Sequence, residues 1–179
     1  MPTRELEFDD APALLAWIQD PAGSRFFMGE TDGLTQADLE AFILSAHLTQ
    51  TNHHLAITDQ ENQLVGLVSL KHLDFQRKQG EFSIGLQPAA QGKGLARAAA
   101  RDLLAFAFVG LRLDRIYMYT LEENTATQRF NLRCGFRPLP GPPDGAAPDT
   151  DAPVRWYGLT QAEYQQMQAE QTGLFHCAS

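Results

Sequence analysis

The chain has little cysteine and no long apolar run. Its two cysteines, Cys134 and Cys177, are too few for a disulfide scaffold, and their spacing fits neither a CxxC pair nor a zinc site. We therefore expect reduced thiols, as in the cytosol. The longest apolar candidate, residues 95–113, is interrupted by four charged side chains, so the sequence predicts no membrane-spanning segment.

Several functional signatures are also missing. The first residues lack the apolar segment of a secretory signal, which favours a cytoplasmic protein. The sequence has no GxxxxGK(S/T) phosphate loop, no GxGxxG dinucleotide fingerprint and no HExxH zinc helix. Its five histidines follow no metal-binding spacing, so we expect no metal ion.

Basic residues are scarce as well, with 14 Lys and Arg against 22 Asp and Glu and a net charge of -8. This balance argues against a nucleic-acid binder, which needs a basic surface. The charge is uneven: residues 1–70 carry -9, residues 71–137 carry +5 and residues 138–179 carry -4. The basic middle segment suggests an anionic ligand, and the acidic flanking segments suggest a cationic one. The alternative is that the net charge of each segment varies by chance and that most of these charged residues are solvated surface.

What the chain does contain is the composition of one globular domain, 1–179, with 44% hydrophobic and 20% charged residues. Within it, the proline-rich segment 138–153 is predicted to be an irregular, exposed insertion. Residues 160–179 are predicted to form a polar helix capped by Thr160 and Glu163, with the last seven residues as a loose tail.

The periodicity predicts an α/β chain with a mixed sheet. Residues 64–70 and 81–87 should pair as an antiparallel hairpin, with Phe82, Ile84 and Leu86 on one face. Thr35 should cap a helix, and Pro12 should lie in the first turn of an earlier one. The other expected strands are residues 4–8, 53–58, 115–121, the segment from 136 and 154–159, and the other expected helices are residues 95–110 and 124–134.

A glycine-rich loop, Gln91-Gly92-Lys93-Gly94-Leu95-Ala96, lies between a predicted strand and the strongest predicted helix. Small residues let a ligand approach the backbone, and the free N–H groups at a helix N-terminus favour an anion such as a pyrophosphate. The alternative is that the glycines only form a tight turn.

This loop resembles the Q/R-x-x-G-x-G/A acyl-CoA loop of the GNAT N-acetyltransferase superfamily. Asn124, followed eleven residues later by Gly135-Phe136, resembles a second signature of the same family. The resemblance covers roughly residues 53–137. It implies a GNAT fold, with a mostly antiparallel central sheet that splays between its fourth and fifth strands and is flanked by helices.

The resemblance also implies acetyl-CoA as co-substrate and assigns residues to it. Backbone groups of Ile84 and Leu86 would pair with the pantetheine amides, with Gly85 as a bulge. Asn124 would bind the pantetheine arm near the thioester; the alternative is a helix N-cap or turn residue, a position compatible with the same contact. The remaining expected cofactor contacts are the loop Gln91, Gly92, Lys93, Gly94, Leu95 and Ala96, then Arg97, Arg129 and Asn131, with Lys93, Arg97 or Arg129 meeting the 3′-phosphate.

Direct attack on a thioester needs a neutral amine, and a carboxylate is the usual group that removes the proton. Glu81 is the predicted base, because relatives place a glutamate at the same distance before the loop. The alternative is a solvated carboxylate at a strand edge. Cys134 has no base partner readable nearby, so we expect a packing residue rather than a nucleophile.

Asn131 occupies the position at which many family members have a tyrosine that protonates the departing thiolate. An amide cannot supply that proton, so the thiolate leaves unaided or Tyr117, Tyr119 or a water replaces the tyrosine. The branch resembling ribosomal-protein alanine acetyltransferases shares this departure. Glu81-Phe82 followed by the QGKGLA loop also resembles diamine and spermidine acetyltransferases, and acidic flanks would suit a polyamine.

Two classes of function follow. The first is transfer of the acetyl group of acetyl-CoA to a primary amine of a small molecule or of a peptide or protein N-terminus. The second is a non-catalytic acyl-CoA-binding or interaction module with the same fold. For the enzyme we expect no nucleic-acid or membrane partner and a monomer or homodimer.

Overall fold

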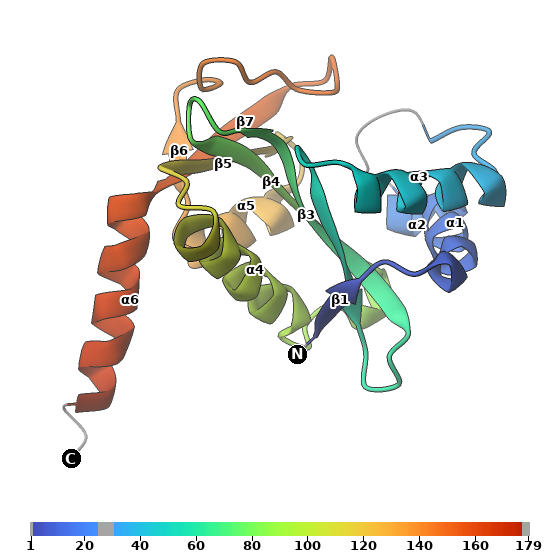
Figure 1. The fold of residues 1–179 in the computed structure, drawn as a ribbon, viewed down its shortest axis with the longest axis horizontal. Coiled ribbons are helices and arrows are strands. Elements are labelled where there is room, and N and C mark those ends of the chain that lie inside the picture. The colour runs from blue at the N-terminus through green and yellow to red at the C-terminus, as the bar shows by residue number, and fades with distance from the viewer. Residues whose placement is uncertain (1, 25–30, 177–179) are drawn as a thin grey trace.

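The computed structural model describes residues 2–24 and 31–176. Its centre is a seven-stranded sheet in the order β1-β2-β3-β4-β5-β7-β6, flanked by helices (Figure 1). The strands are β1 (Thr3–Glu5), β2 (His53–Thr58), β3 (Leu64–Asp74), β4 (Gln79–Leu86), β5 (Arg115–Leu121), β6 (Arg137–Leu139) and β7 (Val154–Thr160). The helices are α1 (Ala11–Gln19), α2 (Pro21–Ser24), α3 (Gln36–Leu48), α4 (Leu95–Ala105), α5 (Thr125–Arg133) and α6 (Gln161–His176).

The sheet is antiparallel except between β4 and β5. These two strands pair in parallel only where Gln79, Gly80 and Glu81 lie opposite Arg115, Ile116 and Tyr117. Beyond Glu81, β4 continues to Leu86 beside β3 alone. The predicted mixed sheet, its antiparallel hairpin and its splay between the fourth and fifth strands are therefore confirmed.

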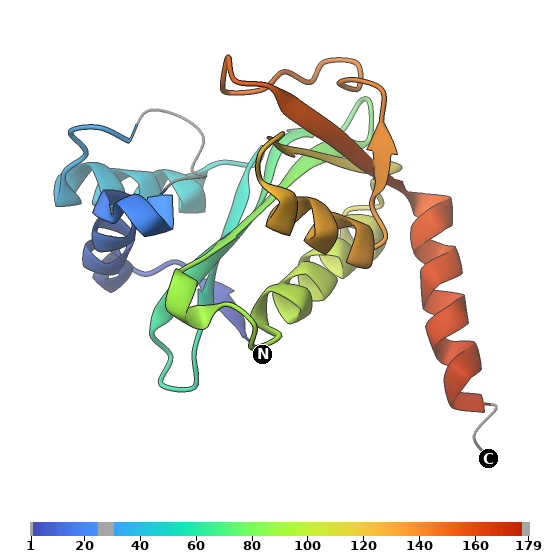
Figure 2. The ribbon, with the colours of Figure 1, turned by 180° about the vertical axis from the view of Figure 1, so that it is seen from behind.

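Each face of the sheet has its own apolar core. Residues that alternate along a strand point to opposite faces, so Ile57 and Ala56 belong to different cores. On one face, α4 and α5 cover Phe82, Ile116 and Met118. On the other face, α1 and α3 cover the β2 and β3 end of the sheet (Figure 2).

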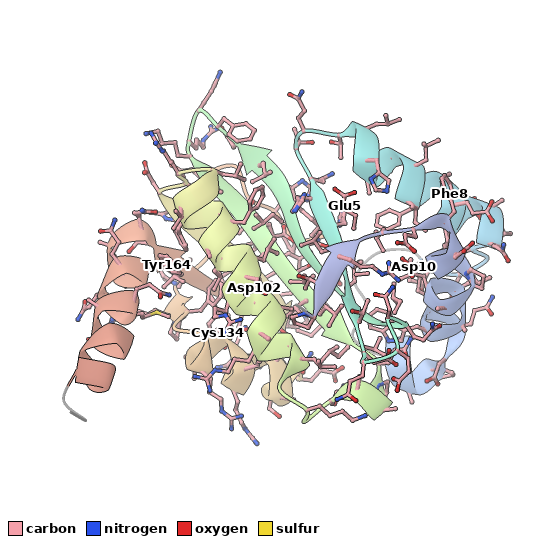
Figure 3. All side chains as sticks on the ribbon, turned by 60° about the horizontal axis from the view of Figure 1, so that its bottom comes forward. Glu5, Phe8, Asp10, Asp102, Cys134 and Tyr164 are labelled. Carbon is pink, nitrogen blue, oxygen red and sulfur yellow. The ribbon has the colours of Figure 1, made fainter. Side chains whose placement is uncertain are left out.

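Side-chain capping marks where α3 and α6 begin. Thr35 and Asp38 form a capping box at the start of α3, and Thr160 and Glu163 form one at the start of α6, as predicted. The first strand is shorter than the predicted 4–8, because Glu7 caps a 3₁₀ turn over Phe8–Asp10. Asp10, between β1 and α1 (Figure 3), accepts hydrogen bonds from Arg4 at 2.7 and 2.8 Å.

The bulge in the β3–β4 pair lies elsewhere than predicted. The β3–β4 register is regular across Gly85, and the irregularity falls between Lys71 and Asp74. Gly85 is small for another reason: a Cβ at this position would lie 3.1 Å from the Trp17 ring. The glycine thus makes room for α1, and the prediction of a bulge at Gly85 is wrong.

The C-terminal third is also more ordered than expected. Residues 138 and 139 belong to β6, and Pro143 in the loop that follows is buried. This loop is tied to the sheet by hydrogen bonds from Gln79 Nε2 to the Asp144 carbonyl, 2.8 Å, and from the Asp149 N–H to the Tyr119 hydroxyl, 2.9 Å. Residues 138–153 are therefore not simply an exposed insertion.

The predicted loose tail over the last seven residues is wrong for its first part. The α6 helix continues to His176, and residues 177–179, with Cys177, lie outside the described residues. Tyr164, labelled in Figure 3, anchors the helix by stacking on Phe108, with ring centroids 4.8 Å apart. From this anchor the helix projects away from the sheet (Figures 1 and 2).

Candidate active site

The candidate site begins where β4 and β5 separate. The Gln87 N–H donates to Val65 of β3, whereas the Lys78 carbonyl accepts from Asp114 just before β5. Because peptide groups alternate in direction along a strand, those of Ile84 and Leu86 face β5, which no longer pairs with them. The Leu86 carbonyl accepts from Gln91 Nε2 at 3.4 Å. This half-open strand leaves peptide groups free for a ligand with amide groups, and the pantetheine contact of Ile84 and Leu86 stays a prediction.

The glycine loop follows directly and presents bare backbone. Gly92 and Gly94 have φ of +76° and +79°, and a Cβ on either would meet nothing within 4 Å. Gly94 is the N-cap of α4 and supplies no side-chain hydrogen bond, so the first N–H groups of the helix remain free for an acceptor. Leu95 and Ala96 form the first turn of that helix. The geometry suits an anion such as a pyrophosphate.

Lys93 lies in this loop, Arg97 lies in the first turn of α4, and Arg129 lies on α5. Lys93, Arg97 and Arg129 are exposed, and the ion pairs found between described residues involve none of them. Each therefore remains available to a phosphate, and which of them would meet it stays a prediction.

Cys134 lies at the end of α5 and is not a nucleophile in this structure. Burial raises the pKa of the thiol to about 11, and only the charge of Arg97 opposes the shift. A thiol with such a pKa stays protonated near neutral pH and is unreactive. This agrees with the expected packing role.

Glu81 is buried, with 3% of its side chain exposed. Its Oε1 lies 2.8 Å from Lys71 Nζ, directly across the β3–β4 pair. Its Oε2 lies 3.8 Å from His72 Nε2 and has no hydrogen-bond partner among the described residues. The alternative of a solvated strand-edge carboxylate is therefore wrong, and one oxygen is left to accept a proton.

Two tyrosines share the face of the sheet that carries Glu81. Tyr117 lies opposite Glu81 in the parallel pair, and burial together with the charge of Glu81 raises its pKa to about 12. Burial likewise raises the pKa of Tyr119 to about 12. Both phenols keep their protons near neutral pH and are able to donate them.

The two asparagines occupy the inner face of α5. Asn124 caps the helix, with Oδ1 accepting from the Thr127 N–H at 3.1 Å, so the capping alternative is confirmed and the pantetheine contact stays a prediction. Asn131, seven residues later, is 0% exposed, and neither atom of its amide has a hydrogen-bond partner among the described residues. A ligand contact of Asn131 also stays a prediction.

A second polar pair, His54 and Ser69, lies on the same face of the sheet next to Lys71 and Glu81, and it was not predicted. His54 Nδ1 lies 2.7 Å from Ser69 Oγ, and the ring packs edge-on against Phe42 of α3. Burial, with the charges of Lys71 and His53, lowers the pKa of His54 to about 4, so the ring is neutral at pH 7. The signal that could have revealed these pairs is the strand register. It aligns His54 with Ser69 and Ser83, and it aligns Lys71 with Glu81.

Residues 2–24 and 31–176 hold neither a metal-binding cluster nor a membrane-spanning helix. No group of three or more His, Cys, Asp or Glu side chains there is arranged to hold a metal ion. None of the helices in the same residues has the length and apolar character needed to cross a bilayer.

Comparison with known proteins gives the family. Residues 3–137 match the family model described as an acetyltransferase (GNAT) domain. The chain is 34% identical over 80 residues to spermidine N(1)-acetyltransferase of Vibrio cholerae. The aligned residues cover 45% of this chain and 46% of that protein. The chain is 28% identical over 90 residues to the Escherichia coli K12 enzyme of the same name, over 50% of this chain and 48% of the other. The matches thus span about half the length of these curated relatives.

Solved structures support the same fold. Spermidine N-acetyltransferase from Vibrio cholerae in complex with CoA and spermine has a TM-score of 0.78 at 22% identity, over 91% of this chain and 96% of the other. A dodecameric structure of the Vibrio cholerae enzyme has a TM-score of 0.71, also at 22% identity, over 90% and 94% of the two chains. The half-open β4 strand, the glycine loop before α4 and the match over residues 3–137 agree, and the chain belongs to the GNAT acetyltransferase family.

Proposed function

We propose that the protein is an acetyl-CoA-dependent N-acetyltransferase that acts on a cationic primary amine. The observation that carries this proposal is Glu81, a buried carboxylate on the strand that parts from β5, one oxygen of which has no hydrogen-bond partner among the described residues. A site that only bound acyl-CoA would have no use for a buried acceptor of protons beside the opening.

Acetyl-CoA lies along the opening in this proposal. The peptide groups of Ile84 and Leu86 bind the pantetheine arm, in place of the strand that β5 does not supply. The N–H groups of Gly92, Gly94 and Ala96 bind the pyrophosphate at the positive end of α4. The support is that these backbone groups are open and that Lys93 and Arg97 beside them form no ion pair with any other described residue.

Glu81 prepares the acceptor for attack. An amine with a pKa of about 10.4 costs roughly 4 to 5 kcal/mol to deprotonate at pH 7, so a base within reach directly or through one water lowers the barrier. The ammonium loses two protons in total as its nitrogen forms the amide bond. One replaces the proton that Tyr117, Tyr119 or a water gives to the CoA sulfur as the C–S bond breaks, and the other reaches solvent through Glu81.

The acceptor is proposed to be a polyamine such as spermidine or spermine. Residues 1–70 carry a charge of -9, and α1 and α3 from this segment cover the face of the sheet that includes Glu81. Asp144 and Asp149 of the loop beside Tyr119 add negative charge. The names of the curated relatives give the same substrate class. We place the reaction in the cytoplasm, with a monomer or homodimer as the active form.

The experiment is a thiol-release assay with acetyl-CoA and a panel of polyamines, aminoglycosides, amino sugars and peptide N-termini. Release with polyamines, together with the acetylated amine identified by mass spectrometry, supports the proposal. Tight CoA binding by calorimetry without release for any amine would show a non-catalytic acyl-CoA-binding module instead.

A further inference from the structure

His72 occupies an unusual backbone conformation beside the candidate base. Its φ is +50°, a left-handed value that residues with a side chain adopt at a cost of about 1 kcal/mol or more. It lies in the bulge between Lys71 and Asp74, and its N–H donates to Asn52 Oδ1 at 3.0 Å. Bulges redirect side chains and occur often beside active sites.

The bulge turns the imidazole toward Glu81. His72 Nε2 lies 3.8 Å from Glu81 Oε2, the oxygen that has no hydrogen-bond partner among the described residues. The Glu81 side chain is 3% exposed and the His72 side chain 55% exposed. The imidazole therefore joins the closed carboxylate to bulk water.

The other charged groups nearby cannot take this role. Lys71 holds Glu81 Oε1 at 2.8 Å, and an ammonium has no lone pair to receive a proton. In the same hairpin, Asp74 and Arg77 are paired with each other at 2.8 Å. A neutral imidazole accepts a proton at one nitrogen and donates one from the other, so it is able to relay a proton between the carboxylate and water.

We propose that His72 is the proton outlet of the site: it takes the proton from Glu81 and releases it to solvent in each turnover. This inference rests on the proposed function. Oε2 of the protonated Glu81 gives its proton to Nε2 of the neutral ring, directly or through one water, which regenerates the carboxylate. The imidazolium then releases a proton to water or buffer, and no other reactant is needed.

The test compares two glycine substitutions in the full chain. His72→Gly removes the ring but keeps a residue that tolerates positive φ. Lys78→Gly is the matched control, because Lys78 has φ +49° in the same hairpin and no ion pair with Glu81 among the described residues. Steady-state kcat is measured with acetyl-CoA and spermidine at pH 7, in a bulky buffer with and without added imidazole.

We expect His72→Gly to lower kcat about tenfold or more, with the KM for acetyl-CoA unchanged and with most of the rate restored by free imidazole. The deficit should shrink at high pH, where hydroxide removes the proton. Lys78→Gly should match the wild type, with and without imidazole.

An unchanged kcat in His72→Gly, or a loss that neither imidazole nor high pH relieves, would overturn the proposal and leave His72 a structural residue of the bulge. Failure of the proposed function looks different. In that case the wild-type protein itself releases no thiol, or Glu81→Gln remains fully active.

Discussion

At the scale of single residues, the two oxygens of Glu81 have different surroundings. One is held by Lys71 at 2.8 Å and the other has no hydrogen-bond partner among the described residues. A buried charge without a counter-charge is costly, so the lysine makes the carboxylate tolerable inside the sheet. The free oxygen keeps the group available for proton transfer.

Replacing this carboxylate tests its role. Glu81→Gln keeps the shape and removes the charge, so kcat/KM at pH 7 should fall about a hundredfold or more. The loss should be smaller at high pH, where free amine is abundant. Because the Lys71 side chain is 25% exposed, it is able to turn toward water when its partner is removed.

A thermal melt provides the control for Glu81→Gln. An equal loss of kcat/KM across the pH range, with the melting temperature unchanged, would contradict the base and assign Glu81 to substrate positioning.

His54 should make the fold sensitive to acid. Its pKa is about 4 in the folded protein and 6.5 in the unfolded chain, so the unfolded state binds more protons between these values. The stability that this difference contributes is complete above pH 6.5 and is lost as the pH falls to 4. It amounts to no more than about 3 kcal/mol.

The measurement is urea unfolding at several pH values in this window. In the His54→Gln variant, the free energy of unfolding should fall less steeply between pH 6.5 and 4 than in the wild type. Parallel curves for the two proteins would show that the ring is not buried in a neutral form.

At the scale of elements, the start of α4 depends on backbone geometry alone. Gly94 caps the helix at φ +79° with open space where a Cβ would be. Gly94→Glu places bulk and negative charge at the expected pyrophosphate site, so the CoA affinity measured by calorimetry should fall more than tenfold.

Gly33→Glu is the control for this loop. Gly33 also has positive φ, +74°, and equally open surroundings, so the substitution carries the same backbone strain far from the loop in sequence. Equal losses of CoA affinity in both variants would reject the assignment of the loop.

Elements marked by local chemistry could be predicted from the sequence. The capping boxes at Thr35 and Thr160, the glycines before α4 and the alternation of β4 all depend on residues close together in the chain. The bulge at residues 71–74, the burial of Glu81 and the loop folded onto Tyr119 could not be predicted, because each depends on strand register or on contacts between distant residues. The role of Gly85 was misjudged for the same reason: its neighbour is Trp17 of α1.

At the scale of the whole molecule, the sheet separates two tasks. The α4 and α5 face carries the start of the α4 helix after the glycine loop, and the opposite face carries Glu81, the tyrosines and the acidic loop. Acidic charge on the acceptor side should attract polycations, and salt should screen that attraction over a Debye length of about 10 Å at 0.1 M.

The KM for a polyamine should therefore rise with salt more steeply than the KM for a monoamine. Neutralising Asp144, Asp149 and Asp151 of the loop with asparagine should reduce the difference. The same salt dependence for both amines would locate polyamine recognition elsewhere.

The brief pairing of β4 with β5, three residues long, also leaves a signature in amide hydrogen exchange. In the last residues of β4, the N–H groups of Ser83 and Gly85 point to β3, whereas those of Ile84 and Leu86 point to the side where β5 no longer pairs with β4. Protection against deuterium should alternate from one residue to the next in the free protein. CoA should slow exchange at 84 and 86 and leave 83 and 85 unchanged, so that the bound cofactor serves as the missing strand.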